Sequence, residues 1–276
     1  MIALTVGAFF LIISPNVNVL NSPDLDLSLL ASYDRTVKIL DVNGDPIDDA
    51  LYDNNKIYVR IDDLPDYTPK AFISIEDKRF YEHGGIDYKR IMGAALSNIK
   101  SGSFREGAST ITQQLIKNTH LSNEKTIRRK LSEMRLARQL ERTFSKDEIL
   151  ESYLNILYFG HGIHGLGTAS RVMFNKPASE LTIAQSAALA SIINNPSRYS
   201  PYTNKENLDR RTKLVLKIMH EQNFIDDEQY DTAINEQIEF GKNKQNQFIA
   251  GLIKNACAEF KCSEKELFLR NITFNT

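Results

Sequence analysis

The chain is poor in cysteine. Its 276 residues include only two, Cys257 and Cys262. Two thiols are too few for a framework of several disulfides or for a four-cysteine zinc site, which excludes a small domain stabilised in either way. A single small disulfide loop stays open for a chain that lies outside the cytoplasm. The favoured interpretation is two isolated thiols without a function.

Charge is missing from the N-terminus. No Asp, Glu, Lys or Arg precedes Asp24, and residues 1–13 are almost wholly apolar. A helix of that length reaches about 20 Å, which is short of the roughly 30 Å hydrocarbon core of a bilayer. A signal peptide is disfavoured because no basic residue precedes the apolar run. The segment could be an interfacial helix, a buried core segment or the remnant of a membrane anchor.

The remaining composition, 42% hydrophobic and 25% charged, is that of an ordinary globular protein. The net charge of −1 hides a strong asymmetry. Residues 117–146 contain nine Lys or Arg and three Asp or Glu, a net of +6, whereas residues 221–239 contain seven acids and no Lys or Arg. Such runs are either solvated helix faces or, for the basic one, a surface for an anionic ligand.

Helical periodicity runs from about residue 65 to 235, and no internal repeat is visible. A weak alternation over residues 36–57, with a turn at Asn43-Gly44, predicts a small β hairpin. Thr68 is predicted as an N-cap with Pro69 at the first helical position, and Asp87 as the cap of a helix to about residue 100. Further helices are predicted from near residue 123, over 208–222 and after 226, with capping boxes at Thr110/Gln113, Ser145/Glu148 and Thr182/Gln185.

A first motif, AFISIEDKRFYEHGGID, occupies residues 71–87. It places Glu76 and Asp77 beside several cations, among them Arg79 and His83. A lone Glu on a helix is usually a surface residue, and an ion pair between Glu76 and Arg79 on one helix face would be worth only a few tenths of a kcal/mol. We expect Asp77 to brace the motif, and for His83 a structural and a functional role are equally open.

A second motif, GASTITQQLIKN, occupies residues 107–118. As composition alone it is a capped polar helix start. A run of neutral hydrogen-bonding side chains beside a glycine loop also suits a sugar or phosphate, because a helix N-terminus presents oriented N–H groups.

A third motif, RRKLSEMRLARQLE, occupies residues 128–141 and contains R-K-x-x-E as Arg129, Lys130 and Glu133. The simple interpretation is an amphipathic helix with an Arg129–Glu133 pair four residues apart.

These three motifs, in this order, resemble those of the peptidoglycan glycosyltransferases, glycosyltransferase family 51, found in class A penicillin-binding proteins and monofunctional transglycosylases. The fourth motif follows as KDEILESYLN at residues 146–155, where Glu151, Tyr153 and Asn155 are expected to hold the domain together. The fifth, normally aromatic-Phe-Gly-Lys, departs from the pattern as MFNK at residues 173–176. The resemblance covers about residues 60–235 and implies a mainly α, lysozyme-like fold with the small N-terminal hairpin.

The resemblance also implies roles for individual residues. Glu76 would be the base that takes the proton of the attacking sugar hydroxyl, with Arg79 near the acceptor. Glu133 would assist departure of a lipid diphosphate, directly or through a divalent metal such as Mg²⁺. Departure of a diphosphate needs neutralisation of charge, which accounts for cations around one acid. The donor would be bound by Ser109, Gln113, Gln114 and Lys117, and the diphosphate by Lys117, Lys125, Arg128 and Lys130.

The implied activity is polymerisation of lipid II into β-1,4 glycan strands with release of undecaprenyl diphosphate. The implied place is the bacterial cytoplasmic membrane, with the catalytic domain on its periplasmic or extracellular face. Partners would be lipid II, undecaprenyl-diphosphate-linked glycan, the membrane and other cell-wall synthases, with no nucleic acid. The implied plan is a partial membrane anchor (1–14), a stalk and hairpin (15–64), the glycosyltransferase domain (65–235) and a linker toward an absent transpeptidase domain (236–276).

Two alternatives remain. A glycan-cleaving hydrolase or lytic transglycosylase also places acids around a sugar bond, but its sugar leaving group has less need of a basic surface. A truncated, inactive fragment could bind lipid II or a partner synthase. Penicillin binding is not expected. The S-x-x-K pattern at Ser97 and Ser122 is a match of letters alone, and no K-T-G is present.

Overall fold

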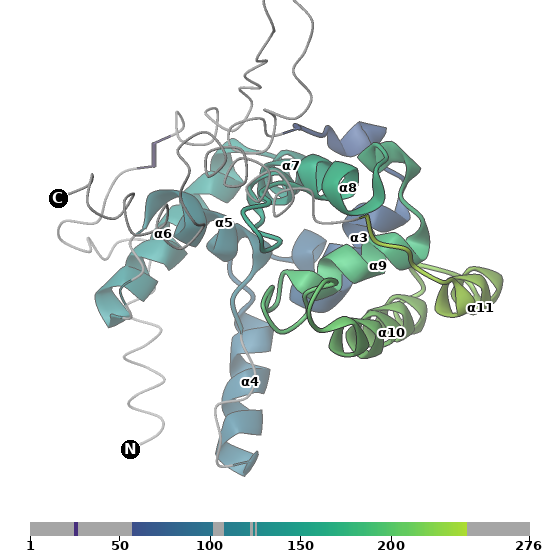
Figure 1. Ribbon diagram of the computed structural model, residues 1–276. Helices are drawn as coiled ribbons and strands as arrows, with labels where there is room; N and C mark the ends of the chain where they lie inside the picture. The colour runs from purple at the N-terminus through teal and green to yellow at the C-terminus, as the bar shows by residue number, and fades with distance from the viewer. Residues whose placement is uncertain (1–24, 27–56, 102–107, 122–123, 125, 242–276) are drawn as a thin grey trace, which may run out of the picture.

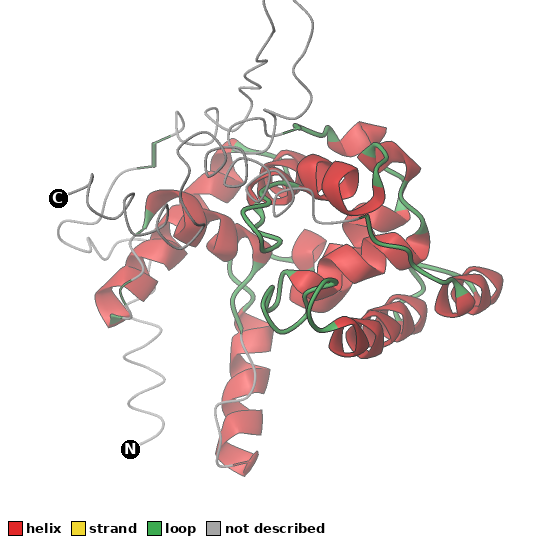
Figure 2. Cartoon of the chain, viewed as in Figure 1, coloured by secondary structure: helices red, strands yellow, loops and turns green. Residues whose placement is uncertain are grey.

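The computed structural model describes residues 25–26, 57–101, 108–121, 124 and 126–241 (Figure 1). The predicted anchor, most of the predicted hairpin, Lys125 and both cysteines lie outside these residues. In the described part of the chain the architecture is mainly α, as expected, and no strand is present beyond an isolated bridge between Tyr158 and His164 (Figure 2).

Nine α-helices form the described body: α3 (Tyr67–Glu76), α4 (Tyr88–Ser101), α5 (Ile111–His120), α6 (Ile127–Thr143), α7 (Lys146–Ile156), α8 (Leu166–Phe174), α9 (Ile183–Ile192), α10 (Lys205–Glu221) and α11 (Asp227–Asn235). Short 3-10 turns occur at Ile61–Asp63, Phe80–Glu82 and Ala178–Glu180. Among these described helices, none is both long and apolar enough to cross a bilayer.

The helices form two packed groups. The alanine-rich α9 is buried along nearly its whole length and packs against α3 and α10, while α5 packs against α6 and α7. The edge-to-face contact of Phe72 in α3 with Phe159 after α7, at 6.5 Å, joins the two groups through fully buried rings. Helix α4 extends away from this body (Figure 1).

Capping explains most helix starts. Thr110, Ser145 and Thr182 each accept from the backbone N–H three residues on, and the Gln or Glu at that position bonds back, so all three predicted capping boxes are confirmed. Asp87 accepts the backbone N–H of Arg90 at 2.8 Å, which confirms its predicted place at the start of α4.

Three predicted helix starts are wrong. Thr68 lies inside α3, whose N-cap is Asp66, because the Thr68 hydroxyl bonds Ser186 of α9 at 2.9 Å instead of the helix backbone. Helix α6 begins at Ile127, since Thr126 supplies its cap. Helix α10 begins at Lys205, ahead of Leu208, the first residue that it buries.

The segment before α3 is held by the fourth motif. Glu151 accepts from the Ile61 backbone N–H at 2.7 Å and the Tyr58 hydroxyl at 2.6 Å. Asn155 bonds the backbone N–H and carbonyl of Val59 at 2.9 and 2.8 Å. Glu151 and Asn155 therefore have the structural role expected of them.

The last described segment, residues 236–241, also packs on the body. The Gly241 N–H donates to the Met173 carbonyl at 2.7 Å, and Phe240 contacts Phe174 with ring centroids 5.3 Å apart. The packed unit therefore includes described residues on both sides of 65–235.

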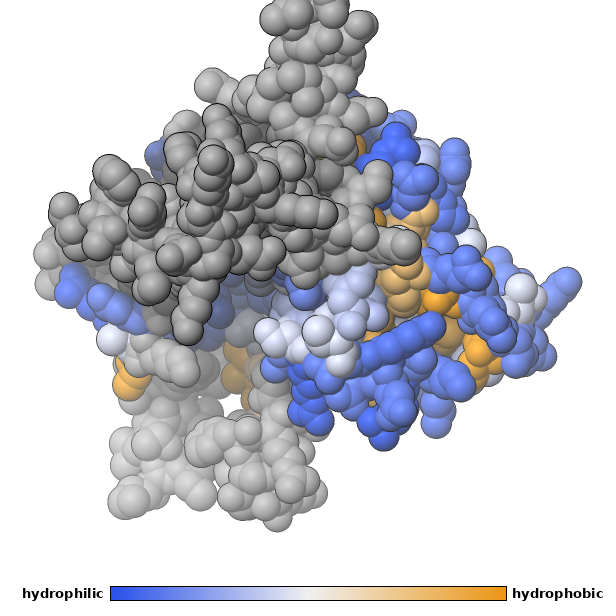
Figure 3. Space-filling model, in the orientation of Figure 1, coloured by the Kyte–Doolittle hydropathy of each residue, from blue (hydrophilic) through white to orange (hydrophobic). Residues whose placement is uncertain are grey.

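The acidic run at residues 221–239 is a solvated face. Helix α11 buries only Ala233, and its acidic side chains point outward. Figure 3 shows mostly hydrophilic residues at the lower right of the molecule, where α10 lies.

Candidate active site

The carboxylate of Glu76 stands at the C-terminal end of α3, where α4 and α5 approach it. Its Oε2 accepts a hydrogen bond from Nε2 of Gln114 in α5 at 2.8 Å. The Arg90 guanidinium, from α4, donates to the backbone carbonyl oxygen of Glu76. The Glu76 side chain is only partly buried, so it is oriented and still accessible to a ligand.

Asp77 ties the end of α3 to the beginning of α5. Its side chain is fully buried, and its Oδ2 accepts the backbone N–H of Ile111 at 3.0 Å and lies 3.0 Å from Nε2 of His83. Ile111 is the first residue of α5, whose leading N–H groups have no partner within the helix. A carboxylate there satisfies one of them and meets the positive end of the helix. Asp77 is therefore a brace, as the sequence predicts.

Residues 109–114, which lead into α5 and form its first residues, join several elements. Four of their polar side chains bond partners elsewhere in the fold: Ser109 with Lys130 (2.8 Å), Thr110 with the Gly85 carbonyl (2.7 Å), Thr112 with Glu141 (2.5 Å) and Gln114 with Glu76 (2.8 Å). The second motif thus lies between the first and the third.

Gln113 faces the interior of the protein. Its side chain is 1% exposed, and its Oε1 accepts the Thr110 N–H in the capping box at 3.1 Å. Its Nε2 is buried without a partner among the described residues. The geometry gives no support to Gln113 as a substrate contact. Lys117, one turn further along α5, is exposed.

Glu133 is a buried carboxylate between two cations. Its side chain is 2% exposed and accepts from Arg129 at 2.6 Å and from the Lys130 ammonium. Lys130 also donates to Ser109 and remains 39% exposed. The pair predicted on helical periodicity, Arg129–Glu133, is present. Arg129 is not among the residues predicted to bind substrate, yet its guanidinium contacts the Glu133 carboxylate directly. Arg128 is exposed beside it.

A divalent metal does not fit these donors. Each Glu133 oxygen already accepts from a cation, and two positive side chains oppose a further positive ion. Within the described residues, no group of three His, Cys, Asp or Glu side chains could hold a metal ion. Arg129 and Lys130 are therefore the positive charges that the site itself provides beside Glu133.

Arg79 pairs with Asp87 and not with Glu76, because α3 ends at Glu76 and the chain turns away. Its Nε donates to Asp87 Oδ2 at 3.1 Å. The hydrogen bond to Asp87 raises the pKa of Arg79. Burial favours the neutral acid of Asp87, but the hydrogen bonds from Arg79 and from the Arg90 N–H outweigh it and lower the pKa of Asp87.

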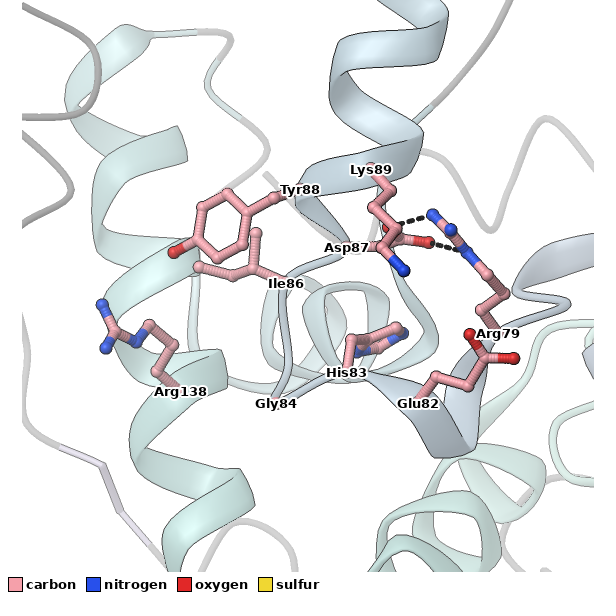
Figure 4. A pocket seen from close by; sticks show the side chains of 9 residues that line it. All are labelled: Arg79, Glu82, His83, Gly84, Ile86, Asp87, Tyr88, Lys89 and Arg138. Atoms are coloured by element: carbon pink, nitrogen blue, oxygen red, sulfur yellow. Dashed lines mark hydrogen bonds and ion pairs between the residues drawn. The ribbon is translucent and has the colours of Figure 1, made fainter. Parts of the chain in front are cut away.

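The Arg79–Asp87 pair borders a cavity of about 440 Å³ (Figure 4). Arg79, Glu82 and Lys89 lie on one side of it, and Tyr88 and Arg138 on the other. His83 lies between them, with its Nε2 held by Asp77. The cavity thus adjoins the first motif and carries several cations, which suits an anionic or sugar ligand.

The sequence predicts a structural role for Tyr153, and the structure also links this residue to the site. The residue is fully buried in α7, and its hydroxyl donates to Gln114 Oε1 at 3.2 Å. Its place on the buried side of α7 is visible in the periodicity of the sequence, but its partner on α5 is not.

The described domain is a mainly helical body that carries an oriented carboxylate, Glu76, and a second, cation-paired carboxylate, Glu133. Residues 43–220 match the Transglycosylase family, and the chain belongs to that family.

The chain is similar to several penicillin-binding proteins. Penicillin-binding protein 1A/1B of Bacillus subtilis (strain 168) is 46% identical over 219 residues, which is 79% of this chain and 24% of that protein. Penicillin-binding protein 1F of the same organism is 41% identical, over 83% of this chain and 33% of its own length. Penicillin-binding protein 1A of Clostridium perfringens (strain 13 / Type A) is 44% identical, over 78% and 33%. The chain spans a quarter to a third of the length of these relatives.

A crystal structure of penicillin-binding protein 1A from Haemophilus influenzae matches 74% of this chain and 21% of that one, at 20% identity and a TM-score of 0.42.

Proposed function

We propose that this chain is a peptidoglycan glycosyltransferase that polymerises lipid II. The observation that carries the proposal is the bridging position of residues 109–114. Gln114 bonds Glu76 at 2.8 Å, and Ser109, five residues earlier, bonds the Lys130 that pairs with Glu133. One short segment therefore holds a candidate base and a cationic group in a fixed relation.

In the proposed reaction Glu76 accepts the proton of the 4-hydroxyl of the acceptor, lipid II. That oxygen attacks the anomeric carbon of the donor, the growing glycan on undecaprenyl diphosphate. The new carbon–oxygen bond forms as the bond to the diphosphate breaks, so the configuration inverts and a β-1,4 linkage results. The leaving diphosphate takes the bonding electron pair and departs with its lipid.

The cations at Glu133 support a diphosphate as leaving group. A diphosphate leaves as an anion, so stabilisation comes from positive charge and hydrogen-bond donors placed in advance. Lys130 is held by Glu133 and Ser109 and is still partly exposed, so it can meet a phosphate oxygen without a large loss of side-chain freedom. A hydrolase would release a sugar hydroxyl and would not need this charge.

Both substrates carry a lipid, so the proposed reaction takes place at a membrane surface. We place the domain on the periplasmic or extracellular face of the cytoplasmic membrane, with other cell-wall synthases as partners.

The test is incubation of the purified protein with fluorescent lipid II, in detergent and in liposomes, followed by gel separation. We expect glycan ladders from the wild type and none from Glu76→Gln. Glu221→Gln, an exposed carboxylate on α10, is the matched control and should retain full activity.

Binding of lipid II without any ladder would favour the inactive fragment, and cleavage of finished peptidoglycan would favour the hydrolase. A ladder that survives Glu76→Gln would show that Glu76 is not the base.

A further inference from the structure

A chain of two hydrogen bonds runs from the protein interior to Glu76. The hydroxyl of Tyr153 in α7 donates to Oε1 of Gln114 at 3.2 Å, and Nε2 of Gln114 donates to Oε2 of Glu76 at 2.8 Å. Tyr153 is 0% exposed, whereas Glu76 is only partly buried. Tyr153, at the buried end of these two hydrogen bonds, is therefore connected to Glu76 through the Gln114 amide.

The direction of this chain is fixed by chemistry. An ionised carboxylate only accepts hydrogen bonds, so the amide must present its NH₂ group to Glu76 and its oxygen to Tyr153. Burial raises the pKa of Tyr153 well above its ordinary value, and the negative charges of Glu76 and Asp77 raise it further. Tyr153 therefore stays a neutral phenol and a hydrogen-bond donor, and the opposite amide orientation would leave both ends mismatched.

We propose that Tyr153 is a positioning residue for glycosyl transfer, whose hydroxyl fixes the Gln114 amide so that its NH₂ group holds Glu76 as a proton acceptor. This inference rests on the proposed function of Glu76. Tyr153 touches neither substrate nor reacting atoms and acts through Gln114.

The other charged groups around Glu76 do not fix the orientation of the Gln114 side-chain amide. Asp77 adjoins it in the chain, but its oxygens are taken by Ile111 and His83. Arg90 of α4 bonds the Glu76 backbone carbonyl and not its carboxylate. Lys130 of α6 is occupied by Ser109 and Glu133.

Without the Tyr153 hydroxyl, the amide is free to turn and to offer its oxygen to Glu76. Only the protonated acid can donate to that oxygen, so the change favours the inactive form of the base.

The experiment compares Tyr153→Phe with Tyr67→Phe across pH, using the full chain and the lipid II assay. Tyr67 lies at the opposite end of α3 and donates one hydrogen bond, to the Leu181 carbonyl at 2.8 Å, so the control deletes the same atom from a partly buried ring that packs against the core. We expect Tyr153→Phe to move the acid limb of kcat to higher pH by about one unit, a tenfold loss of rate on that limb, and to leave the rate at alkaline pH nearly unchanged. Tyr67→Phe should not move the limb.

A double-mutant cycle with Gln114→Ala tests the route. If Tyr153 acts through the amide, Tyr153→Phe adds no further shift in the Gln114→Ala background. A uniform loss of rate at every pH, a shift equal to that of Tyr67→Phe, or an added shift in the Gln114→Ala background would each overturn the proposal.

A readout without substrate separates this inference from the proposed function. In ¹³C-glutamate-labelled protein, with Glu76→Gln for assignment, the Glu76 carboxyl signal should change at higher pH in Tyr153→Phe than in wild type or Tyr67→Phe. An unchanged titration would overturn the positioning role even for an active enzyme. Absence of any glycan ladder from wild type, together with a shifted titration, would instead overturn the proposed function and leave the hydrogen-bond chain intact.

Discussion

The carboxylate of Asp77 accepts the backbone N–H of Ile111, 34 residues further along the chain, at 3.0 Å. One buried oxygen thus joins the end of α3, which carries Glu76, to the first residue of α5, which carries Gln114. The hydrogen bond between Glu76 and Gln114 depends on the relative position in which this contact holds the two helices.

Asp77→Asn should lower the free energy of unfolding by about 1–3 kcal/mol, because the amide turns a donor toward Ile111 or His83 and leaves buried groups unsatisfied. Urea denaturation measures the change. Asp66→Asn is the control: Asp66 is 94% exposed and paired with Lys70, so its loss should change stability by less than about 1 kcal/mol. Equal effects of the two substitutions would contradict the brace.

Glu133→Gln should destabilise the protein by about 1–3 kcal/mol, since the buried side chain loses its negative charge and its new NH₂ group faces either Arg129 or Lys130. The exposed pair of Lys217 and Glu221, at 3.6 Å, offers the matched change, and Glu221→Gln should cost less than about 1 kcal/mol. Thermal and urea unfolding of both variants check this. If Glu133→Gln is as stable as wild type, the two cations find other partners and the description of this site is wrong.

Gly85→Ala should destabilise the protein by about 2 kcal/mol or more, because a left-handed backbone is costly for alanine and a clash adds to it. Gly85 has φ +84°, and an added Cβ would lie 2.8 Å from the Ala137 carbonyl oxygen. Its neighbour Gly84 has no atom within 4 Å of that position, so Gly84→Ala should be neutral or slightly stabilising. Calorimetry of the two single variants distinguishes them, and similar melting temperatures would refute the close packing of this turn.

Stability should depend on pH through Asp87. Its pKa is lowered in the folded protein, so its contribution is present above the unfolded pKa of about 3.9 and is lost as pH falls through the folded value. The stability difference between wild type and Asp87→Asn should therefore be constant at neutral pH and shrink below about pH 4. Urea titrations at a series of pH values measure it, and a difference that grows on acidification would reverse the assigned sign.

The features predicted correctly from sequence are those that depend on neighbouring residues. The capping box of Thr110 and Gln113 involves four consecutive residues, and so its geometry follows from local chemistry alone. The same holds for Asp87 and the Arg90 N–H. Each motif is also a short local run, and the motifs together predict the family that residues 43–220 match.

The features missed from sequence depend on the partner across the fold. Thr68 is of a residue type favoured at N-caps, yet its hydroxyl is hydrogen-bonded to Ser186 of α9. Gln113 and Gln114 are adjacent and chemically identical, but the helix turns the first inward and aims the second at Glu76. Arg79 could be placed near Glu76 in sequence, but its position is decided by Asp87. Periodicity gives the face of a helix, and only packing gives what lies opposite.

The bridging segment at residues 109–114 has a consequence for the dynamics of the molecule. Because Ser109 bonds the Lys130 that pairs with Glu133, and Gln114 bonds Glu76, a local opening of this one segment would release both carboxylates together. The two ends of the site should therefore exchange with solvent as one cooperative unit. A ligand that stabilises either end would slow amide exchange at the other, even where it makes no contact there.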